Sequence, residues 1–296
     1  MGTNRMKRRA RTLVYPLTAS AVAMGLIVAT PAQADTLGIT SLSSVIKDQV
    51  GAFTRVDTDK VTNSSTSVTT VGDPEVSLGE LWFVGTSTLK NNTDDSLTLT
   101  SESFTKTFDD TVSKTVTKGV DVANEVSADI DLGKAVKMGT TLTTTWTFSE
   151  ENSTSQSQSV SYTAPSQDIT VPAHSTATVT VRLQQATATG KVELSTELGG
   201  KFDGWQCSGG ACVSGYEPLY DTISDVQKSG KNWDGKSTPA LPDGFSLNAT
   251  KKTLSFKGEG TYTATYGANF DVEVTTTPNT VSAPAKKSYS FTVPAV

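Results

Sequence analysis

The sequence predicts an all-β protein with one short helix near its N-terminus. Three observations carry this prediction. Apolar residues recur at every second position along most of the chain, pairs of Gly, Pro and Asn interrupt these runs, and a single short stretch has helical spacing. No block of fixed length repeats, which disfavours a solenoid or a propeller.

The first 34 residues are typical of a secretory signal peptide. Five basic residues and no acidic residue accompany an apolar run over 13–28, and Ala32-Gln33-Ala34 follows as a small-residue cleavage site. The pair Arg8-Arg9 would suit a twin-arginine signal, but Arg11 stands where that signal needs an apolar residue, which favours the general export route. We expect a secreted protein that begins at Asp35.

Charge restricts the partners of the secreted chain. Removing 34 of the 296 residues leaves 262, and it removes five of the 25 basic residues but none of the 30 acidic ones, so the formal net charge becomes −10. Such a surface repels nucleic acid. No later apolar run approaches the roughly 18 residues of a membrane-spanning helix, so we expect the exported chain to be soluble.

The two cysteines, Cys207 and Cys212 in CSGGAC, are expected to form a structural disulfide outside the cell. The chain-entropy model values such a tight loop at about 2 kcal/mol. The alternative is a zinc site, but two thiols and the only histidine, His174, are too few ligands for a closed one. We expect neither a metal nor another cofactor.

The predicted helix lies between Asp35 and about Phe53. Its apolar residues recur at three- and four-residue spacing, and they are Leu42, Val45, Ile46 and Val50. Ser41 precedes them as a possible N-cap.

Strands are predicted wherever apolar and polar residues alternate. These runs cover 80–89, 96–108, 168–171, 176–186, 191–198, 253–256, 261–266 and 271–276. The Ser- and Thr-rich tract 140–161 could be a disordered linker, but its large apolar residues all have even numbers, which favours strands with an apolar row and a hydroxyl row. The segment 201–246 has little periodicity and many glycines, so we expect an irregular, loop-rich insertion.

The sharpest alternation lies in two runs of 13 residues, VDVANEVSADIDL (120–132) and VKMGTTLTTTWTF (136–148). Even positions carry the apolar side chains Val120, Val122, Val126, Ala128, Ile130, Leu132, Val136, Met138, Leu142, Trp146 and Phe148. Odd positions carry the charged side chains Asp121, Glu125, Asp129, Asp131 and Lys137. A three-residue turn at Gly133-Lys134-Ala135 would place Leu132 opposite Val136 and Val120 opposite Phe148, giving a hairpin with one apolar face.

Each arm of this hairpin is long enough to cross a membrane, because a tilted transmembrane strand needs only about 9–11 residues. A lone hairpin cannot remain in lipid, since its outer edges would present unpaired amide and carbonyl groups. Insertion therefore requires a closed ring of several copies. Taken alone, the pattern favours the alternative of a half-buried strand in a soluble protein. The two interpretations are compatible, because a soluble form must bury the same face.

Three stretches between about Leu81 and Gly200 resemble, in their order and spacing, the aerolysin-like β-pore-forming toxins, particularly the epsilon-toxin and mosquitocidal-toxin branch. The first is LWFVGTSTLKNNTDDSLTLTSESFTKTF, in which a strand, an Asn-rich turn and a Ser/Thr-alternating strand follow one another. The second is the hairpin 120–148. The third is YTAPSQDITVPAHSTATVTVRL followed by GKVELSTELGG.

This resemblance implies an elongated, multi-domain all-β molecule of long, twisted antiparallel strands, secreted as a soluble monomer. It implies docking on a glycan or protein receptor of the target-cell membrane, assembly into a ring, commonly a heptamer, and insertion of 120–148 into a shared transmembrane barrel. The apolar residues named above would face lipid, the charged ones would line the pore, and Gly133, Lys134 and Ala135 would form the tip.

The resemblance also divides the chain. Residues 35–80 would be a short N-terminal region that could contact the receptor, 81–200 the pore-forming module, and 201–296 a C-terminal β region with the disulfide loop.

Two further sites follow from family behaviour and from exposed aromatic residues. Members are often activated by proteolysis near a terminus, and Lys286-Lys287 is a candidate cleavage site, although a solvated lysine pair is the favoured alternative. Trp205 and Trp233 could contact a receptor by stacking on sugar rings or entering a lipid interface, or they could pack the loop segment on itself.

An enzyme is not expected. His174 lacks the nucleophile and orienting acid of a catalytic triad, and we expect it to lie in a turn. The adjacent acids Asp109-Asp110 and Glu150-Glu151 would point to opposite faces of a strand, so they do not form a glycosidase pair. The alternatives to a pore-forming toxin are a secreted binding module or adhesin, and, less favoured, an extracellular hydrolase.

Overall fold

The computed structural model describes residues 38–135, 141–150, 153–281 and 285–295. All of them belong to one compact unit, Asp35–Val296. The predicted signal peptide, residues 1–34, lies outside the described part of the chain, as do Val136, Lys137 and Met138.

The described elements confirm an all-β protein and follow one another in this order: β1 (Gly38–Ser41), α1 (Leu42–Val50), β2 (Arg55–Asp57), β3 (Val61–Asn91), β4 (Leu97–Thr100), β5 (Phe104–Asp121), β6 (Ser127–Asp131), α2 (Leu132–Ala135), β7 (Thr143–Thr147), β8 (Thr154–Ala164), β9 (Asp168–Val171), β10 (Ser175–Ser208), β11 (Ala211–Pro218), α3 (Leu219–Ser229), β12 (Phe245–Asn248), β13 (Thr253–Pro278) and β14 (Lys287–Pro294).

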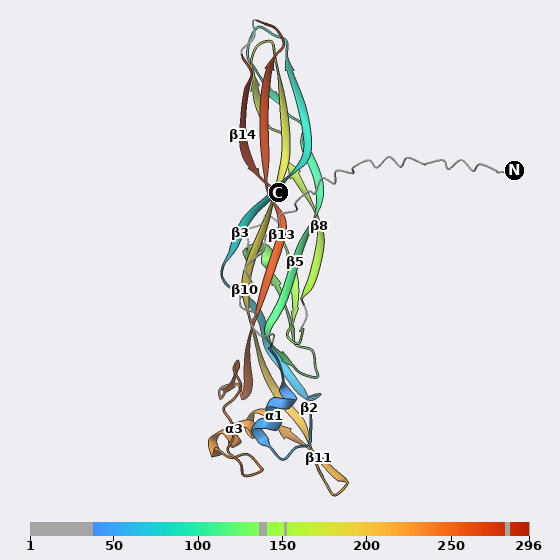
Figure 1. Ribbon diagram of the computed structural model, residues 1–296, viewed down its shortest axis with the longest axis vertical. Coiled ribbons are helices and arrows are strands. Elements are labelled where there is room, and N and C mark those ends of the chain that lie inside the picture. Colours follow the sequence, from blue (N-terminus) through green and yellow to red (C-terminus); the bar gives the residue numbers. More distant parts are fainter. Residues whose placement is uncertain (1–37, 136–140, 151–152, 282–284, 296) are drawn as a thin grey trace, which may run out of the picture. The chain divides into compact units, whose positions relative to one another are not determined.

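Two long antiparallel strands, β10 and β13, form the axis of the main sheet (Figure 1). The 34 residues of β10 would span about 110 Å at 3.3 Å per residue. One edge of β10 pairs with β13 and the other with β3, while β5 and β14 pair with successive stretches of β13. β8 extends the sheet beyond β5. β3 and β10 run through residues 80 and 200, where segment boundaries were expected.

The long strands β10 and β13 continue through 187–190 and 257–260, which lay between the predicted runs. A Cβ atom on Gly190 would lie 2.6 Å from the ring of Tyr262, and one on Gly260 would lie 2.5 Å from the ring of Trp146. A glycine inside a strand often marks such a close approach. These glycines therefore seat aromatic rings on the sheet and do not end its strands.

Two apolar cores lie along the sheet. The larger core contains α1, part of α3 and the described apolar residues of the predicted hairpin. It also contains apolar residues from 112–120 of β5, 186–202 of β10 and 254–266 of β13. The smaller is enclosed between the opposite end of the main sheet and the two-stranded sheet β4–β9. The strand predicted over 96–108 divides at Ser101–Ser103, because β4 pairs with β9 and β5 joins the main sheet.

The helix α1 confirms the prediction, with Leu42, Val45, Ile46 and Val50 all buried. Ser41 occupies the N-cap position, although its hydroxyl hydrogen-bonds to the hydroxyl of Ser43 at 2.9 Å and does not cap the helix.

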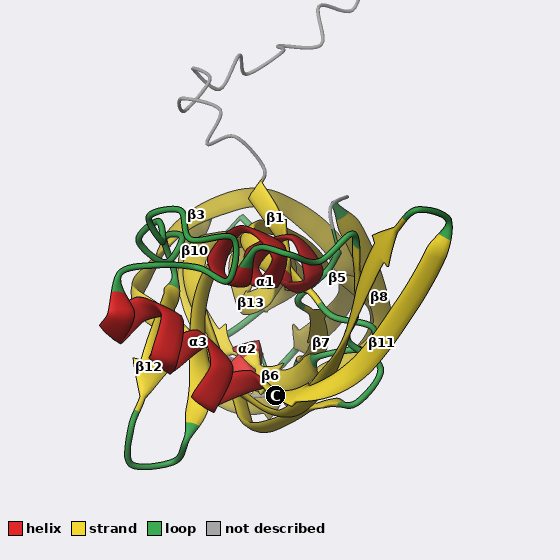
Figure 2. Cartoon of the chain, turned by 90° about the horizontal axis from the view of Figure 1, so that it is seen from below, coloured by secondary structure: helices red, strands yellow, loops and turns green. Residues whose placement is uncertain are grey.

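A second helix, α3, falls in the segment predicted to be irregular. Leu219, Ile223 and Val226 are buried, and their spacing of four and three residues is helical. It contacts α1 at one end of the long strands (Figure 2). The preceding strands β10 and β11 form a hairpin, whose cysteines Cys207 and Cys212 are joined by the predicted disulfide.

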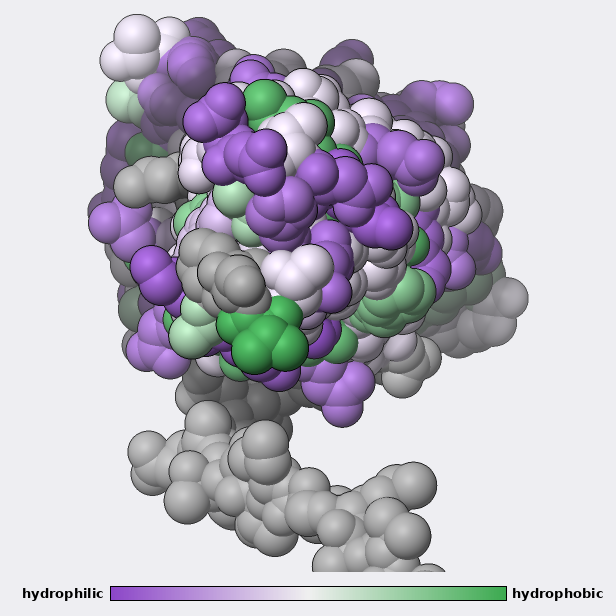
Figure 3. Space-filling view, turned by 90° about the horizontal axis from the view of Figure 1, so that it is seen from above, coloured by the Kyte–Doolittle hydropathy of each residue, from purple (hydrophilic) through white to green (hydrophobic). Residues whose placement is uncertain are grey.

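The opposite end of the unit has a mostly hydrophilic surface with scattered apolar residues (Figure 3). Among the described residues, no helix combines the length and the apolar character needed to span a membrane.

Candidate functional site: an amphipathic hairpin folded against the sheet

The predicted hairpin is present as a two-stranded sheet of β6 and β7, separate from the main sheet. Its register pairs Ser127 with Thr147 and Asp131 with Thr143. The prediction paired Asp131 with residue 137, so the return arm lies six residues further along the chain. An even shift leaves every side chain on its expected face.

The predicted partner of Leu132, Val136, lies outside the described residues, and the Leu132 N–H donates to the carbonyl of Leu142 at 2.9 Å. The carboxylate of Asp131 accepts hydrogen bonds from the backbone N–H groups of Gly133 (3.0 Å) and Leu142 (3.1 Å). These bonds close a longer loop, in which Leu132–Ala135 form the one-turn helix α2. Hydrogen bonds to the Asp131 side chain therefore hold the backbone here, where a tight turn was predicted.

The ascending arm is also not one continuous strand. β5 ends at Asp121, and the next residues are held by other segments. The Thr58 hydroxyl accepts a hydrogen bond from the Ala123 N–H (3.0 Å), and the Asn124 amide donates to the carbonyl of Val61 (2.8 Å). At the base, the Phe148 N–H donates to the Val126 carbonyl at 2.9 Å, which continues the register of β6 and β7, and the Phe148 carbonyl accepts a hydrogen bond from the Val120 N–H at 3.1 Å. Phe148 therefore lies opposite Val126, although it remains close to Val120.

The apolar face of the hairpin is buried in the larger core. Its described residues are Val120, Val122, Val126, Leu132, Leu142, Trp146 and Phe148, all at most 8% exposed, with Ala128 and Ile130 partly buried. On the other face, Asp121, Glu125 and Asp129 are exposed and Asp131 is partly exposed. The monomer therefore hides one face of the segment and shows the other to solvent.

Trp146 anchors the return arm. Its side chain is fully buried over Gly260 of β13, and its indole N–H has no hydrogen-bond partner. An unpartnered buried N–H is destabilising by about 1–3 kcal/mol. The site therefore combines extensive apolar burial with one unsatisfied hydrogen-bond donor.

Lys114 of β5 holds the same arm by three contacts. Its side chain is 6% exposed, its ammonium nitrogen lies 3.2 Å from the carboxylate of Glu150, and it donates to the backbone carbonyl of Thr145. It also lies over the ring of Trp146, 5.8 Å from the centroid. A charge this buried is tolerable only because these partners replace its water.

Lys114 was missed from the sequence, although a signal was available. It occupies an even position between Val112 and Val116, which are both buried. A lysine in the middle of an apolar row indicates a buried charge that needs a partner.

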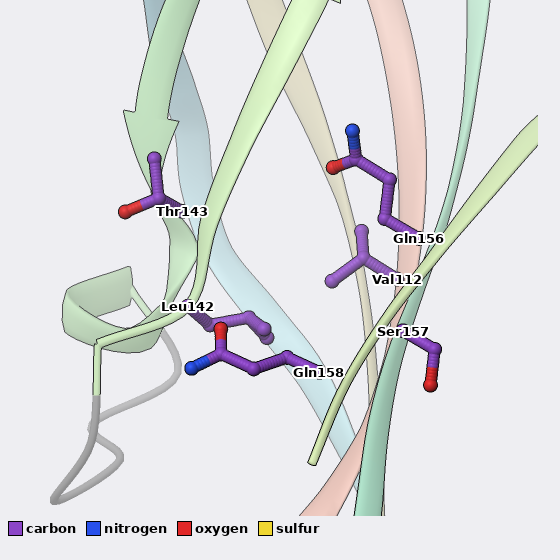
Figure 4. A pocket seen from close by; sticks show the side chains of 6 residues that line it. All are labelled: Val112, Leu142, Thr143, Gln156, Ser157 and Gln158. Carbon is purple, nitrogen blue, oxygen red and sulfur yellow. The ribbon is translucent and has the colours of Figure 1, made fainter. Parts of the chain in front are cut away.

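A cavity of about 420 Å³ separates the hairpin from the strands behind it (Figure 4). It is lined by Val112, Leu142, Thr143, Gln156, Ser157 and Gln158. The Thr144 hydroxyl donates to the Gln156 amide oxygen at 2.8 Å, which is a contact between β7 and β8. The hairpin is therefore packed tightly at Trp146 and loosely beside Leu142.

A second buried ionisable group lies on β5. The Tyr162 hydroxyl donates to the Asp110 carboxylate at 2.6 Å. Burial raises the pKa of Asp110, and the bond from Tyr162 opposes this shift. Asp110 is 1% exposed while Asp109 is exposed, as expected for neighbours on a strand.

The other predicted site residues lie apart from the hairpin. Trp205 is partly buried, with Arg55 5.5 Å above its ring, and Trp233 is 47% exposed. Lys286 and Lys287 are exposed where β14 begins.

His174 lies in a turn, with its imidazole 2.7 Å from the carboxylate of Asp94. Among the described residues, no group of three or more His, Cys, Asp or Glu side chains is placed to hold a metal ion.

Residues 52–287 match the family model described as Clostridium epsilon toxin ETX/Bacillus mosquitocidal toxin MTX2. A search of curated proteins finds no match.

Several solved structures share the fold. The Mpp75Aa1.1 β-pore-forming protein from Brevibacillus laterosporus has a TM-score of 0.61 at 20% identity, over 81% of this chain and 76% of that one. The Cry23Aa1 and Cry37Aa1 binary complex has a TM-score of 0.58 at 18% identity, over 88% of this chain and 97% of that one. A non-toxic crystal protein from Bacillus thuringiensis has a TM-score of 0.56 at 16% identity, over 77% of this chain and 89% of that one. At these identities the likeness shows the fold alone.

Proposed function

The chain belongs to the Clostridium epsilon toxin ETX/Bacillus mosquitocidal toxin MTX2 family, and from this membership we propose that it is a secreted toxin that oligomerises on a target membrane and inserts the hairpin 120–148 into a transmembrane β-barrel. The observation that supports insertion is the two-faced hairpin. Its described apolar side chains are buried or partly buried, yet among the residues that the structure describes β6 and β7 pair only with each other. β6 and β7 can therefore leave without breaking the ladder of the main sheet, and departure of the whole segment 120–148 would break only the pairs of Val120 and Asp121 with Thr40 and Ser41 of β1.

Lipid can replace the protein core as the apolar partner of this face. In the proposed barrel, lipid would be contacted by Val120, Val122, Val126, Ala128, Ile130, Leu132, Val136, Met138, Leu142, Trp146 and Phe148. The pore would be lined by Asp121, Glu125, Asp129, Asp131 and Lys137. Several copies are required, because only a closed barrel pairs every backbone group in a membrane. The family resemblance favours a ring that is commonly a heptamer.

Insertion would also extend the hairpin. Five residue pairs join β6 to β7 in the monomer, whereas arms of 13 residues that meet at Gly133-Lys134-Ala135 would make a span of sufficient length. Moving the return arm by six residues keeps every side chain on its face. We propose that Asp131 releases its two backbone N–H groups during this change.

A secreted binding module or adhesin on the same scaffold is the alternative. One fold neighbour is a crystal protein described as non-toxic, so the fold by itself does not establish pore formation. The two functions differ in whether β7 must leave the body of the protein.

A reversible lock on the hairpin distinguishes them. Thr144 of β7 and Gln156 of β8 touch at 2.8 Å beside the cavity of about 420 Å³, which gives a reagent access. In a Thr144→Cys/Gln156→Cys variant, a short bis-methanethiosulfonate reagent would join the two strands. We expect the joined protein to lose dye release from liposomes and to regain it after reduction.

The same reagent and reductant applied to the wild type control for reduction of the native disulfide. Each single-cysteine variant controls for attachment at one end only. Undiminished dye release by the joined variant would contradict insertion of this hairpin. A wild type that binds cells but leaves liposomes sealed at every concentration would favour the adhesin.

A further inference from the structure

We propose that a shallow cavity at the helical end of the unit, between β11 and the loop after α3, binds a neutral sugar ring of a cell-surface glycan. This proposal deepens the receptor step of the proposed function and rests on it for its biological role. The cavity has a volume of about 200 Å³ and is lined by Phe53, Gly204, Gln206, Val213, Ser214, Gly215, Glu217 and Trp233.

The wall of this cavity is an exposed tryptophan held by another aromatic ring. Trp233 is 47% exposed, and the ring of Phe53 meets it edge-on with 5.3 Å between centroids. The backbone N–H of Trp233 donates to the backbone carbonyl of Val50 at 2.8 Å, which fixes the main chain that carries the ring. An indole fixed at one side and open at the other offers a flat apolar surface, on which the C–H face of a sugar can stack.

The floor is a stretch of backbone without side chains. Gly204 of β10 and Gly215 of β11 face each other across the hairpin. Phe53 covers Gly204, since a Cβ atom there would lie 2.3 Å from its ring, whereas nothing lies within 4 Å of the corresponding position on Gly215. This leaves an open floor that a ligand can approach closely.

Two polar side chains border the floor and are not engaged elsewhere. Gln206 and Glu217 lie on the same face of the hairpin as the two glycines, because they are displaced by two residues along their strands. In the part of the chain that the structure describes, neither makes a side-chain hydrogen bond or an ion pair. Beside an aromatic face, the amide can donate hydrogen bonds to sugar hydroxyl groups and accept them, and the carboxylate can accept them.

Charge and size favour this ligand over others. The lining contains one acid and no base, so a phosphate headgroup or an acidic sugar would be repelled. The volume lies below the roughly 300–1,000 Å³ of sites for drug-sized ligands, which fits a single ring. Trp205 takes no part, since it alternates with Gly204 and Gln206 along β10 and is covered by Arg55.

The test titrates the mature chain with four neutral methyl glycosides, those of glucose, galactose, mannose and N-acetylglucosamine, and follows the indole N–H signals by NMR. We expect at least one glycoside to shift the Trp233 signal. Trp233→Ala should weaken its binding at least tenfold, and Glu217→Gln should weaken it by a smaller factor. Tyr289→Ala is the matched control, because Tyr289 is also 47% exposed but lies on β14, and it should leave binding unchanged.

Three results would overturn the proposal: none of the four glycosides binds, Trp233→Ala binds as tightly as the wild type, or Trp233→Ala loses binding to glycan-free phosphatidylcholine vesicles, which would identify a lipid contact. Dye release from such vesicles at high protein concentration tests pore formation separately. Sugar binding without dye release would leave the site intact and remove the toxin function. Dye release without sugar binding would leave the toxin function intact and remove the sugar site.

Discussion

At the scale of single residues, Lys114 is the polar contact that joins β5 to the return arm of the hairpin. Replacing it by Met keeps the length of the side chain but leaves Glu150 and the Thr145 carbonyl without their partner. Loss of such a partner typically costs about 1–3 kcal/mol, and 1.4 kcal/mol corresponds to a factor of ten in an equilibrium. We expect amide hydrogens of 143–147 to exchange about tenfold faster in Lys114→Met.

The matched control is Lys106→Met on the same strand. Lys106 also lies over an aromatic ring, that of Phe108 at 5.5 Å, and donates to a backbone carbonyl, that of Phe83. It is exposed and does not touch the hairpin. If both variants exchange equally fast in 143–147, or neither differs from the wild type, Lys114 does not hold the arm.

Glu197 makes the stability of the long strands depend on pH. Burial alone would raise its pKa, but hydrogen bonds from Thr253 (2.5 Å), Ser255 (2.7 Å) and Asn248 (3.0 Å), with a contact from Lys251, lower it to about 2. A pKa below the unfolded value of 4.5 gives stability that is present above pH 4.5 and lost as the pH falls toward 2. At one pKa unit per 1.36 kcal/mol, this amounts to at most about 3 kcal/mol.

Urea unfolding of Glu197→Gln between pH 7 and pH 2 measures this contribution. The variant should be less stable at pH 7 and should converge on the wild type in acid. Glu193→Gln is the control, because Glu193 is 42% exposed and has one surface ion pair with Lys257, which is typically worth less than about 1 kcal/mol. A difference for Glu197→Gln that does not change with pH would show that its charge is not responsible.

At the scale of elements, side-chain parity could be predicted from the sequence, while pairing and boundaries could not. Alternation fixes which face of a strand is apolar, so the faces of the hairpin agree with their burial in the monomer. Register depends on the loop, and the carboxylate of Asp131 closes a longer one. The predicted runs stopped short of Gly190 and Gly260, because the rings that cover these glycines, Tyr262 and Trp146, come from distant segments.

The helix α3 was also not predicted from the sequence. Its buried residues have helical spacing, but the glycines and aromatic residues around them in 201–246 concealed an 11-residue helix. Trp205 and Trp233 were treated as one candidate surface, although alternation along β10 places Trp205 away from the cavity that Trp233 lines. This separation depends on the position of Phe53, which no local pattern reveals.

The charges of the proposed pore predict its ion selectivity. Four acidic residues and only Lys137 stand on the odd positions of the hairpin, so a ring of copies would concentrate cations. Reversal potentials across planar bilayers should show cation preference in the wild type and a reduced preference in Asp129→Asn/Asp131→Asn. Asp109→Asn, an exposed acid outside the hairpin, should behave as the wild type. Preference for anions would mean that the two faces are assigned wrongly.

At the scale of the whole molecule, the C-terminal strand covers an edge of the main sheet. β14 pairs with Asn269–Thr276 of β13, and its side chains Phe291 and Val293 pack against the smaller core. Cleavage at Lys286 or Lys287 would release it and leave an unpaired edge that another copy could join. We expect trypsin to raise the yield of SDS-resistant oligomer, and a Lys286→Gln/Lys287→Gln variant to respond less. Equal activation of both proteins would exclude this site.

Hydrogen exchange across residues 120–148, measured in solution and then on liposomes that release dye, tests insertion of the hairpin most directly. We expect the backbone amides of β6 and β7 to lose their protection when the protein meets the membrane, and most of the segment to be protected again in the oligomer, because a closed barrel pairs every strand. Dye release while β6 and β7 keep the exchange pattern of the monomer would contradict insertion.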